Sequence, residues 1–367
     1  MTVRSVSIFT AELPFHAPFR ISLSVMTGTT NLFVRLEASD GSVGWGEASP
    51  SPSITGDTAA SMAAVAPRLA RTLLGREVAD LGGAHRAMLL EVPGNPTMRS
   101  AFDMALHDLA ARKAGLPLFA FLGGARRVFQ TDNTVSLDDP DTMAATARRF
   151  LKAGFRAIKA KVGTGASDDI ARIRALREAI GPDIPLRVDA NQGWDVPSAV
   201  RVLTETTECA LEYCEQPVLR RDHAGLKAVR EAVGVPVMAD ESVFDAEDAL
   251  ALARADACDY LNIKLSKSGG LWVGRQIATI GQAAGMACMV GCMSETRLGL
   301  SAAAHLMSAL PIIRFADLDS HVDHVVDPVV GGIEIRDGRV YLPEGPGLGA
   351  RPSEDFLASC PRQDIEA

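Results

Sequence analysis

The middle of the chain alternates short apolar runs with longer amphipathic stretches. From about residue 130 to residue 320, each run of five to seven mainly apolar residues precedes a stretch with helical periodicity, and equivalent positions recur every 24 to 28 residues. One strand, one helix and two short loops occupy about that length. Eight such units predict an α/β fold with eight parallel strands closed into a TIM-type barrel. The predicted strands are 133–137, 157–162, 186–190, 211–215, 235–240, 260–265, 288–293 and 312–318.

The two ends of the chain have a different pattern. Residues 30–36 and 41–46 are predicted strands around an Asp40-Gly41 turn, and 58–74 and 98–114 are predicted helices, so the first third is a mixed α+β region. No full helix is evident after the last barrel strand. A hairpin is predicted at 331–342 instead, and we expect this tail to return to the N-terminal region.

Composition and charge exclude several classes of protein. The 367 residues are 47% hydrophobic and carry a net charge of −8, which is ample for a folded core and unfavourable for binding nucleic acid or an anionic membrane. No uncharged apolar stretch approaches 18 residues and no signal peptide is evident, so we expect a cytoplasmic protein. The six cysteines form no C-x-x-C pair, which favours reduced thiols over a disulfide framework.

Charged residues interrupt the second predicted strand. Lys159 and Lys161 alternate with apolar residues, so both lysines share one face. The apolar face of a barrel strand meets the surrounding helices, and the lysines must therefore point into the barrel. Two buried ammonium groups require carboxylates nearby.

The next three predicted strands supply those carboxylates. Asp189, Glu215 and Asp240 each stand where a strand gives way to a loop, at the end where barrel enzymes place catalysis. Three converging carboxylates need a cation, and hard oxygen ligands without His or Cys favour Mg²⁺ over Zn²⁺. The sequence therefore predicts one Mg²⁺ site per subunit.

The sixth predicted strand brings a third lysine to the opposite side. Lys264 lies four strands from Lys161, which is half of an eight-membered ring. A divalent cation and ammonium groups stabilise the charge that develops when a proton is removed next to a carboxylate. Two lysines on opposite faces of one carbon allow removal on one side and delivery on the other, as in a racemase or epimerase. Lys267 is predicted to lie in the following loop without a catalytic role.

The complete set of motifs resembles the enolase superfamily, in its muconate lactonizing enzyme subgroup. The resemblance spans essentially the whole chain. It implies a (β/α)7β barrel at 126–322, an α+β capping domain at 1–125, and a C-terminal segment at 323–367 that returns to the cap. It also implies metal ligands at Asp189, Glu215 and Asp240, acid/base lysines at Lys161 and Lys264, and a carboxylate-polarising lysine at Lys159. The motifs are Val43-Gly-Trp-Gly-Glu-Ala48, Lys159-Ala-Lys161, Asp189-Ala-Asn191, Glu215-Gln-Pro217, Asp240-Glu-Ser242, Lys264, Gly269-Gly270 and Pro346-Gly-Leu-Gly349.

Within this subgroup, the last barrel strand resembles that of the dipeptide epimerases. Asp317-Leu-Asp319 looks like the Asp-x-Asp motif whose carboxylates hold the N-terminal ammonium group of a dipeptide, and an anionic pair suits a cation. Epimerases of the L-Ala-D/L-Glu type often carry an arginine in the capping loop, where this chain has Ser24. Leu23, Met26 and Ile54 favour a small or apolar side chain in the substrate instead.

The expected function is therefore Mg²⁺-dependent epimerisation of the C-terminal residue of a dipeptide. The alternatives are an N-acylamino acid racemase, an o-succinylbenzoate synthase or a cycloisomerase of the same subgroup, and a non-catalytic metal or peptide binder. Related proteins are often oligomers, so we also expect a homo-oligomer, by analogy alone. The expected substrate-binding residues are Asp317, Asp319, Thr134, Ser24, Ile54, Cys292 and Ser294.

Overall fold

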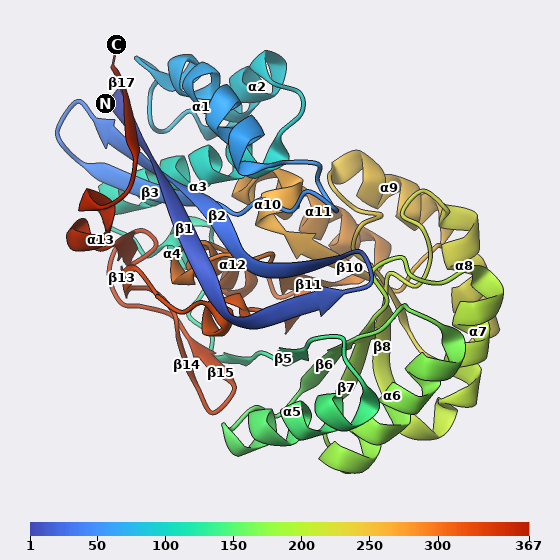
Figure 1. The fold of residues 1–367 in the computed structure, drawn as a ribbon. Helices are drawn as coiled ribbons and strands as arrows, with labels where there is room; N and C mark the ends of the chain where they lie inside the picture. The colour runs from blue at the N-terminus through green and yellow to red at the C-terminus, as the bar shows by residue number, and fades with distance from the viewer. Residues whose placement is uncertain (367) are drawn as a thin grey trace.

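A long antiparallel hairpin dominates the N-terminal part of the computed structural model, which describes residues 1–366. Strands β1 (Val3–Ile21) and β2 (Ser24–Ala38) form this hairpin, and β3 (Val43–Ala48) pairs with β2. The last strand, β17 (Arg362–Glu366), pairs with β1, so the sheet order is β17-β1-β2-β3 and the two termini lie side by side (Figure 1). The distal end of the hairpin reaches over the barrel (Figure 1).

Helices cover one face of this sheet. The predicted helices at 58–74 and 98–114 correspond to α1 (Ala59–Leu73) and α3 (Pro96–Lys113), with α2 (Leu81–Glu91) between them. Gly44 and Gly46 of β3 lie against the backbone of α3, where a side-chain Cβ would clash with the carbonyl oxygens of Ala105 and Ala101. The glycines in this strand therefore permit the close packing of β3 on α3.

The second body is a curled sheet of eight parallel strands in sequential order with helices around it (Figure 1). This arrangement confirms the predicted barrel architecture. The strands are β5 (Asn133–Val135), β6 (Ile158–Lys161), β7 (Leu186–Asp189), β8 (Leu211–Glu215), β9 (Val237–Ala239), β10 (Tyr260–Lys264), β11 (Ala287–Gly291) and β12 (Ile313–Ala316). The outer helices are α5 (Pro140–Lys152), α6 (Ala166–Ile180), α7 (Val196–Glu205), α8 (His223–Ala232), α9 (Ala246–Ala255), α11 (Leu271–Ala284) and α12 (Arg297–Ala309).

The barrel closes between its first and last strands without a regular ladder in residues 1–366. The seam is bridged by the Asp132 amide, which donates to the carbonyl of Ala316 at 3.3 Å. Behind the seam, Arg187 forms an ion pair with Asp132 at 2.7 Å, and its guanidinium lies 5.4 Å from the ring centre of Tyr213. These buried residues fill the barrel interior below the carboxyl ends of the strands.

The tail after β12 begins with a 3₁₀ turn at Ser320–Asp323, and in the residues described no long helix follows the last barrel strand directly, as expected. The α-helix that the described tail does contain, α13 (Glu354–Ala358), is five residues long. The predicted hairpin is β14 (Glu334–Arg336) with β15 (Arg339–Tyr341), and β15 pairs with β4 (Phe129–Gln130) rather than with the cap. The domain limits at 125 and 322 remain a prediction from the sequence. Across residues 1–366, every helix is too short or too polar to cross a membrane. The remaining short elements are α4 (Leu118–Phe121), η1 (Thr207–Cys209), α10 (Leu265–Ser268), β13 (Val329–Gly331), β16 (Ala350–Pro352) and α13 (Glu354–Ala358).

Candidate active site

Three carboxylates converge at the carboxyl ends of neighbouring barrel strands. Asp189 is the last residue of β7, Glu215 is the last residue of β8, and Asp240 directly follows β9. All three side chains are fully buried, and one carboxylate oxygen of each lies within 4.8 Å of the other two. The structure therefore brings together the three residues that the sequence predicted as metal ligands.

The oxygen atoms of this cluster fit a divalent cation. Glu215 Oε2 and Asp240 Oδ2 are buried and accept no hydrogen bond of normal geometry. Ammonium nitrogens do lie near them, Lys159 Nζ at 2.7 Å from the glutamate oxygen and Lys264 Nζ at 2.8 Å from the aspartate oxygen. These contacts are ion pairs that lack the alignment of a hydrogen bond. Both oxygens therefore remain suited to a metal ion, which does not need an aligned N–H donor. Hard oxygen donors alone favour Mg²⁺.

Two lysines flank the carboxylates from opposite sides. Lys161 ends β6, and its Nζ lies 2.6 Å from Asp189 Oδ2. Lys264 ends β10 and contacts Asp240. Because β7, β8 and β9 lie between these two strands in the sheet, the ammonium groups approach the centre of the site from its two sides. This is the arrangement expected for exchange of a proton across one carbon atom.

The third lysine lies at the base of the site. Lys159 Nζ lies 2.7 Å from Glu215 Oε2, 2.8 Å from Asp317 Oδ2 and 3.3 Å from Asp189 Oδ2. Burial alone would lower the pKa of Lys159, but Asp317, Glu215 and Asp189 outweigh it and hold that pKa well above its usual value. Lys159 is therefore a permanent cation here and not a base.

Burial and neighbouring charges shift the pKa values of the cluster carboxylates in opposite directions. Burial and the neighbouring Asp189 and Asp240 raise the pKa of Glu215 to about 7. Burial also acts on Asp189, but Lys161, Lys159 and Lys264 hold its pKa below the usual value. Glu215 is thus the carboxylate of the cluster whose negative charge is least stabilised within the protein, and a bound divalent cation would favour its ionised form.

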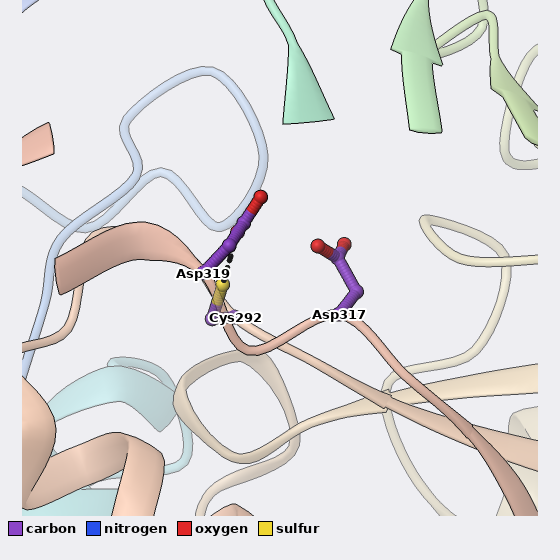
Figure 2. A group of neighbouring side chains, drawn as sticks. All are labelled: Cys292, Asp317 and Asp319. Atoms are coloured by element: carbon purple, nitrogen blue, oxygen red, sulfur yellow. Dashed lines mark hydrogen bonds between the residues drawn. The ribbon is translucent and has the colours of Figure 1, made fainter. Parts of the chain in front are cut away.

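A second carboxylate pair lies beside β12. Asp317 and Asp319 follow the end of that strand and extend toward the same space, with Cys292 below Asp319 (Figure 2). The amide of Thr134 donates to Asp319 Oδ2 at 2.6 Å, its hydroxyl donates to Asp317 Oδ1 at 3.3 Å, and Cys292 Sγ lies 3.7 Å from Asp319 Oδ1. Thr134 and Cys292 were both predicted to line the site, and here they hold the two aspartates in place.

A small cavity of about 40 Å³ lies between residues of the cap and Lys161 and Lys264. Its wall includes Ile54 and both Lys161 and Lys264, and it also includes Cys292 and Ser294, as the sequence predicted. The remaining lining residues are Phe19, Ile21, Met26, Pro50, Ser51, Asn191 and Met293. The space above the lysines is therefore mainly apolar.

The tip of the β1–β2 hairpin closes this cavity from above. Ser22 Oγ donates to the carbonyl oxygens of Ala190 and Asn191, at 3.0 Å each. Ser24 is half-buried at the start of β2 and lies outside the cavity wall, whereas the neighbouring Leu23 is exposed. The hairpin, which sequence patterning located only from residue 30 onward, thus contributes the roof of the site.

Several residues of the site were missed or misplaced by the sequence analysis. Lys267 was predicted to lie in a loop, and this was wrong. It lies in the one-turn helix α10, fully buried, and donates to Asp240 Oδ1 at 2.6 Å. Asn262 Nδ2 donates to Glu215 Oε1 at 2.8 Å, and Gln216 Oε1 accepts the amide of Asp240 at 2.9 Å. Their proximity to the recognised motifs was the only available signal, since their partners are distant in sequence.

The backbone changes direction sharply after Asp189 and Glu215. Asn191 and Gln216 adopt left-handed φ angles of 41° and 37°, which side chains other than glycine rarely do. The turn at Asn191 lets its amide donate to Asp189 Oδ1 at 2.9 Å and its side chain donate to Glu241 Oε1 at 3.2 Å. The strained backbone thus allows hydrogen bonds that fix the positions of the carboxylates.

Comparison with known proteins identifies the family. Residues 3–123 match the model of the mandelate racemase/muconate lactonizing enzyme N-terminal domain, and residues 142–356 match the enolase C-terminal domain-like model. A D-Ala-D/L-Ala epimerase from Cytophaga hutchinsonii is 41% identical, covering 98% of both chains. A hydrophobic dipeptide epimerase from Enterococcus faecalis is 39% identical, covering 95% of this chain and 99% of the relative.

The solved structures agree with these relatives. The dipeptide epimerase from Cytophaga hutchinsonii, complexed with Mg and the dipeptide D-Ala-L-Val, superimposes with a TM-score of 0.98 at 40% identity over 100% of both chains. Fold, sequence and the arrangement of charged residues at the strand ends therefore lead to one conclusion. This chain belongs to the mandelate racemase/muconate lactonizing enzyme family of the enolase superfamily.

Proposed function

We propose that this protein is a Mg²⁺-dependent dipeptide epimerase that inverts the α-carbon of the C-terminal residue. The observation that carries the proposal is the placement of Lys161 and Lys264 on opposite sides of a carboxylate cluster, next to the paired Asp317 and Asp319. The first feature suits removal and return of a proton, and the second suits the ammonium group of a dipeptide. Epimerase relatives at about 40% identity over nearly the whole chain support the same function.

Each residue group has one task in this mechanism. Asp189, Glu215 and Asp240 hold Mg²⁺, which when bound neutralises negative charge on the substrate carboxylate. Lys161 and Lys264 remove and deliver the α-proton at opposite faces, so one lysine must start neutral and the other protonated. Lys159, a permanent cation, stabilises the charge that develops when the α-carbon loses its proton.

We infer that small or apolar dipeptides are the substrate class. The cavity beside the lysines is walled by Phe19, Ile21, Met26 and Ile54, and no arginine or lysine from the cap lines it within residues 1–366. An acidic side chain would have to enter this wall without a cationic partner, at the cost of its hydration. The apolar wall therefore favours residues such as alanine, valine or leucine over glutamate.

Isotope exchange tests the proposal directly. The protein is incubated with Mg²⁺ and an L-Ala-L-Xaa library in D₂O, and mass spectrometry follows the gain of one deuterium. We expect exchange and inversion for apolar C-terminal residues and much slower exchange for L-Ala-L-Glu. Absence of exchange on every dipeptide would contradict the proposed function.

Two variants assign the lysines. Lys161→Ala and Lys264→Ala are each expected to abolish inversion, while each retains exchange with only one of the two epimers. Retention of full inversion by either variant would contradict the two-base mechanism.

The family includes enzymes that act on acylated amino acids, and the ammonium group separates the two classes. L-Ala-L-Phe is compared with N-acetyl-L-Phe, which lacks a free ammonium group. Preference for the acetylated compound would assign Asp317 and Asp319 another role and favour an N-acylamino acid racemase. Cytoplasmic location and a homo-oligomeric state remain predictions from sequence and analogy.

A further inference from the structure

Lys267 is the fourth buried lysine at the site, and no step of the proposed reaction uses it. Its Nζ donates to Asp240 Oδ1 at 2.6 Å, to the Asn262 carbonyl at 2.9 Å, and to the backbone carbonyl of Asp240 itself. An ammonium group has three N–H donors, and all three are used here. Lys267 therefore has no free N–H directed at the substrate space, unlike Lys161 and Lys264, which line the cavity.

Oδ2 is the one polar atom of Asp240 that these hydrogen bonds leave unoccupied. The amide of Asp240 donates to Gln216 Oε1 at 2.9 Å, and its carbonyl and Oδ1 both accept from Lys267. Only Oδ2 remains, and it is the oxygen that lies 2.8 Å from Lys264 Nζ and accepts no hydrogen bond. The side-chain rotamer and the backbone of Asp240 are therefore both fixed so that Oδ2 faces the site.

Lys267 also lies in the wall between the site and a larger space. A polar cavity of about 560 Å³ separates the cap from the barrel, and Lys267, Glu241 and Arg99 are among its lining residues. The Lys267 side chain is almost completely buried, and its Nζ lies 5.9 Å from the ring centre of Phe244 on the same wall. Without the ammonium group, Oδ1 of Asp240 would be unpaired beside this cavity, while the carbonyl would keep its hydrogen bond from the Val243 amide at 3.0 Å. Water would then compete for the carboxylate.

We propose that Lys267 is a positioning residue that orients Asp240 so that its Oδ2 faces the metal ion. The inference rests on the proposed role of Asp240 as a metal ligand. Outer contacts that fix a ligand typically change metal affinity 10- to 100-fold when they are lost. The effect of Lys267 is therefore on Mg²⁺ binding and not on the proton-transfer step.

The test is a Mg²⁺ titration of Lys267→Met by isothermal titration calorimetry, without substrate. Methionine keeps the length of the side chain and removes all three donors. We expect the Kd for Mg²⁺ to rise about 10- to 100-fold. Turnover of the best dipeptide should require correspondingly more Mg²⁺, while kcat at saturating Mg²⁺ stays within about threefold of the wild type.

Lys267→Gln, which retains one donor group, is expected to bind Mg²⁺ with intermediate affinity, and circular dichroism verifies that both variants fold. Lys227→Met is the matched control, because Lys227 is a half-exposed lysine on α8 that contacts Glu231 and the Ala255 carbonyl and none of the three cluster carboxylates. A Kd for Lys267→Met within twofold of the wild type overturns the inference, as does a kcat that saturating Mg²⁺ fails to restore. If neither variant folds, the residue is structural and the inference is wrong.

These results are separable from the proposed function. Calorimetry reports Mg²⁺ binding whether or not any dipeptide is turned over. Wild-type protein that binds Mg²⁺ but exchanges no dipeptide proton would contradict the epimerase and leave the role of Lys267 decided by the titration alone.

Discussion

Two aspartates only two residues apart experience opposite electrostatic environments. Burial acts on both, but Lys159, Lys264 and Lys161 hold the pKa of Asp317 below its usual value. Asp319 has no such cations, and burial together with Asp317 and Asp323 raises its pKa to about 7. A cation that enters between the two aspartates therefore meets one fixed negative charge and one that depends on pH.

The first prediction follows from this asymmetry. As the pH falls through about 7, Asp319 gains a proton and the pair loses one of its two negative charges. The kcat/KM for a dipeptide should therefore fall on the acidic side with a midpoint near 7, and it should fall again above pH 8 as the substrate α-amino group loses its proton. Initial rates measured from pH 5.5 to 9 test both limbs.

Asp319→Asn is the control for this titration. The amide retains the size of the side chain, and its oxygen can still accept from the Thr134 amide. We expect a lower kcat/KM throughout and no acidic limb near pH 7. An acidic limb with the same midpoint in Asp319→Asn would assign that titration to another group.

Residues of this site differ in how readily the sequence alone predicts them. Lys161 and Asp189 were predictable because a charged residue at the end of an apolar strand is costly unless it has a function. Lys267 was not predictable, because it acts by donating to the carbonyl of Asp240. Asp240 is 27 positions away, and no sequence pattern indicates this contact. Side-chain chemistry is readable residue by residue, whereas hydrogen bonds to the backbone require the fold.

Among the elements, the β1–β2 hairpin has the most direct influence on the site. Its base packs in the cap, and its far end touches the barrel through Ser22 and through Arg20, whose amide donates to Ser136 Oγ at 2.8 Å. The far end was not predictable as strand because it is rich in polar and exposed residues and contains Pro14 and Pro18. Its structure depends on pairing between β1 and β2 and on contacts with the barrel mouth.

The second prediction concerns closure of this hairpin. Ser22→Ala removes the hydroxyl that donates to the carbonyls of Ala190 and Asn191. One such hydrogen bond contributes about 0.5–1.5 kcal/mol, so the KM for a dipeptide should rise about twofold to tenfold while kcat changes less. Thr27→Ala, an exposed position on the same hairpin, is the control. Equal effects of both substitutions would show that closure does not depend on Ser22.

The third prediction concerns Glu47, which joins cap and barrel. This buried carboxylate of β3 accepts from the amide and hydroxyl of Thr296 at 2.8 Å each, from the Gly299 amide at 2.9 Å and from Asn31 Nδ2 at 2.7 Å. In Glu47→Gln the new amide group must face at least one of these donors. We expect a loss of stability of about 2 kcal/mol, seen as a lower Tm by scanning calorimetry. Glu178→Gln, at an exposed site, should leave the Tm unchanged.

On the scale of the whole molecule, the fold brings together charged residues that are far apart in the sequence. The lysines and carboxylates come from β6, β7, β8 and β10 and from the residues that follow β9 and β12, and the cap supplies part of the mainly apolar cavity wall. Strand order and spacing were predictable because a repeated strand and helix admit few topologies. The return of the tail to the N-terminal region was also predicted, and β17 pairs with β1. The pairing of β15 with β4 was not, since no local pattern indicates it.

The final prediction tests whether the cluster of three carboxylates makes the stability of the folded protein depend on Mg²⁺. An ion that binds the folded protein alone stabilises it by RT ln(1 + [L]/Kd), about 2.7 kcal/mol at 100 times the Kd. Because Asp189, Glu215 and Asp240 meet only in the folded barrel, Mg²⁺ should raise the Tm and a chelator should reverse the rise. Glu215→Gln should lose most of this increase, whereas Asp319→Asn, outside the cluster, should retain it. A Tm that Mg²⁺ leaves unchanged would mean that the three carboxylates do not form a metal site.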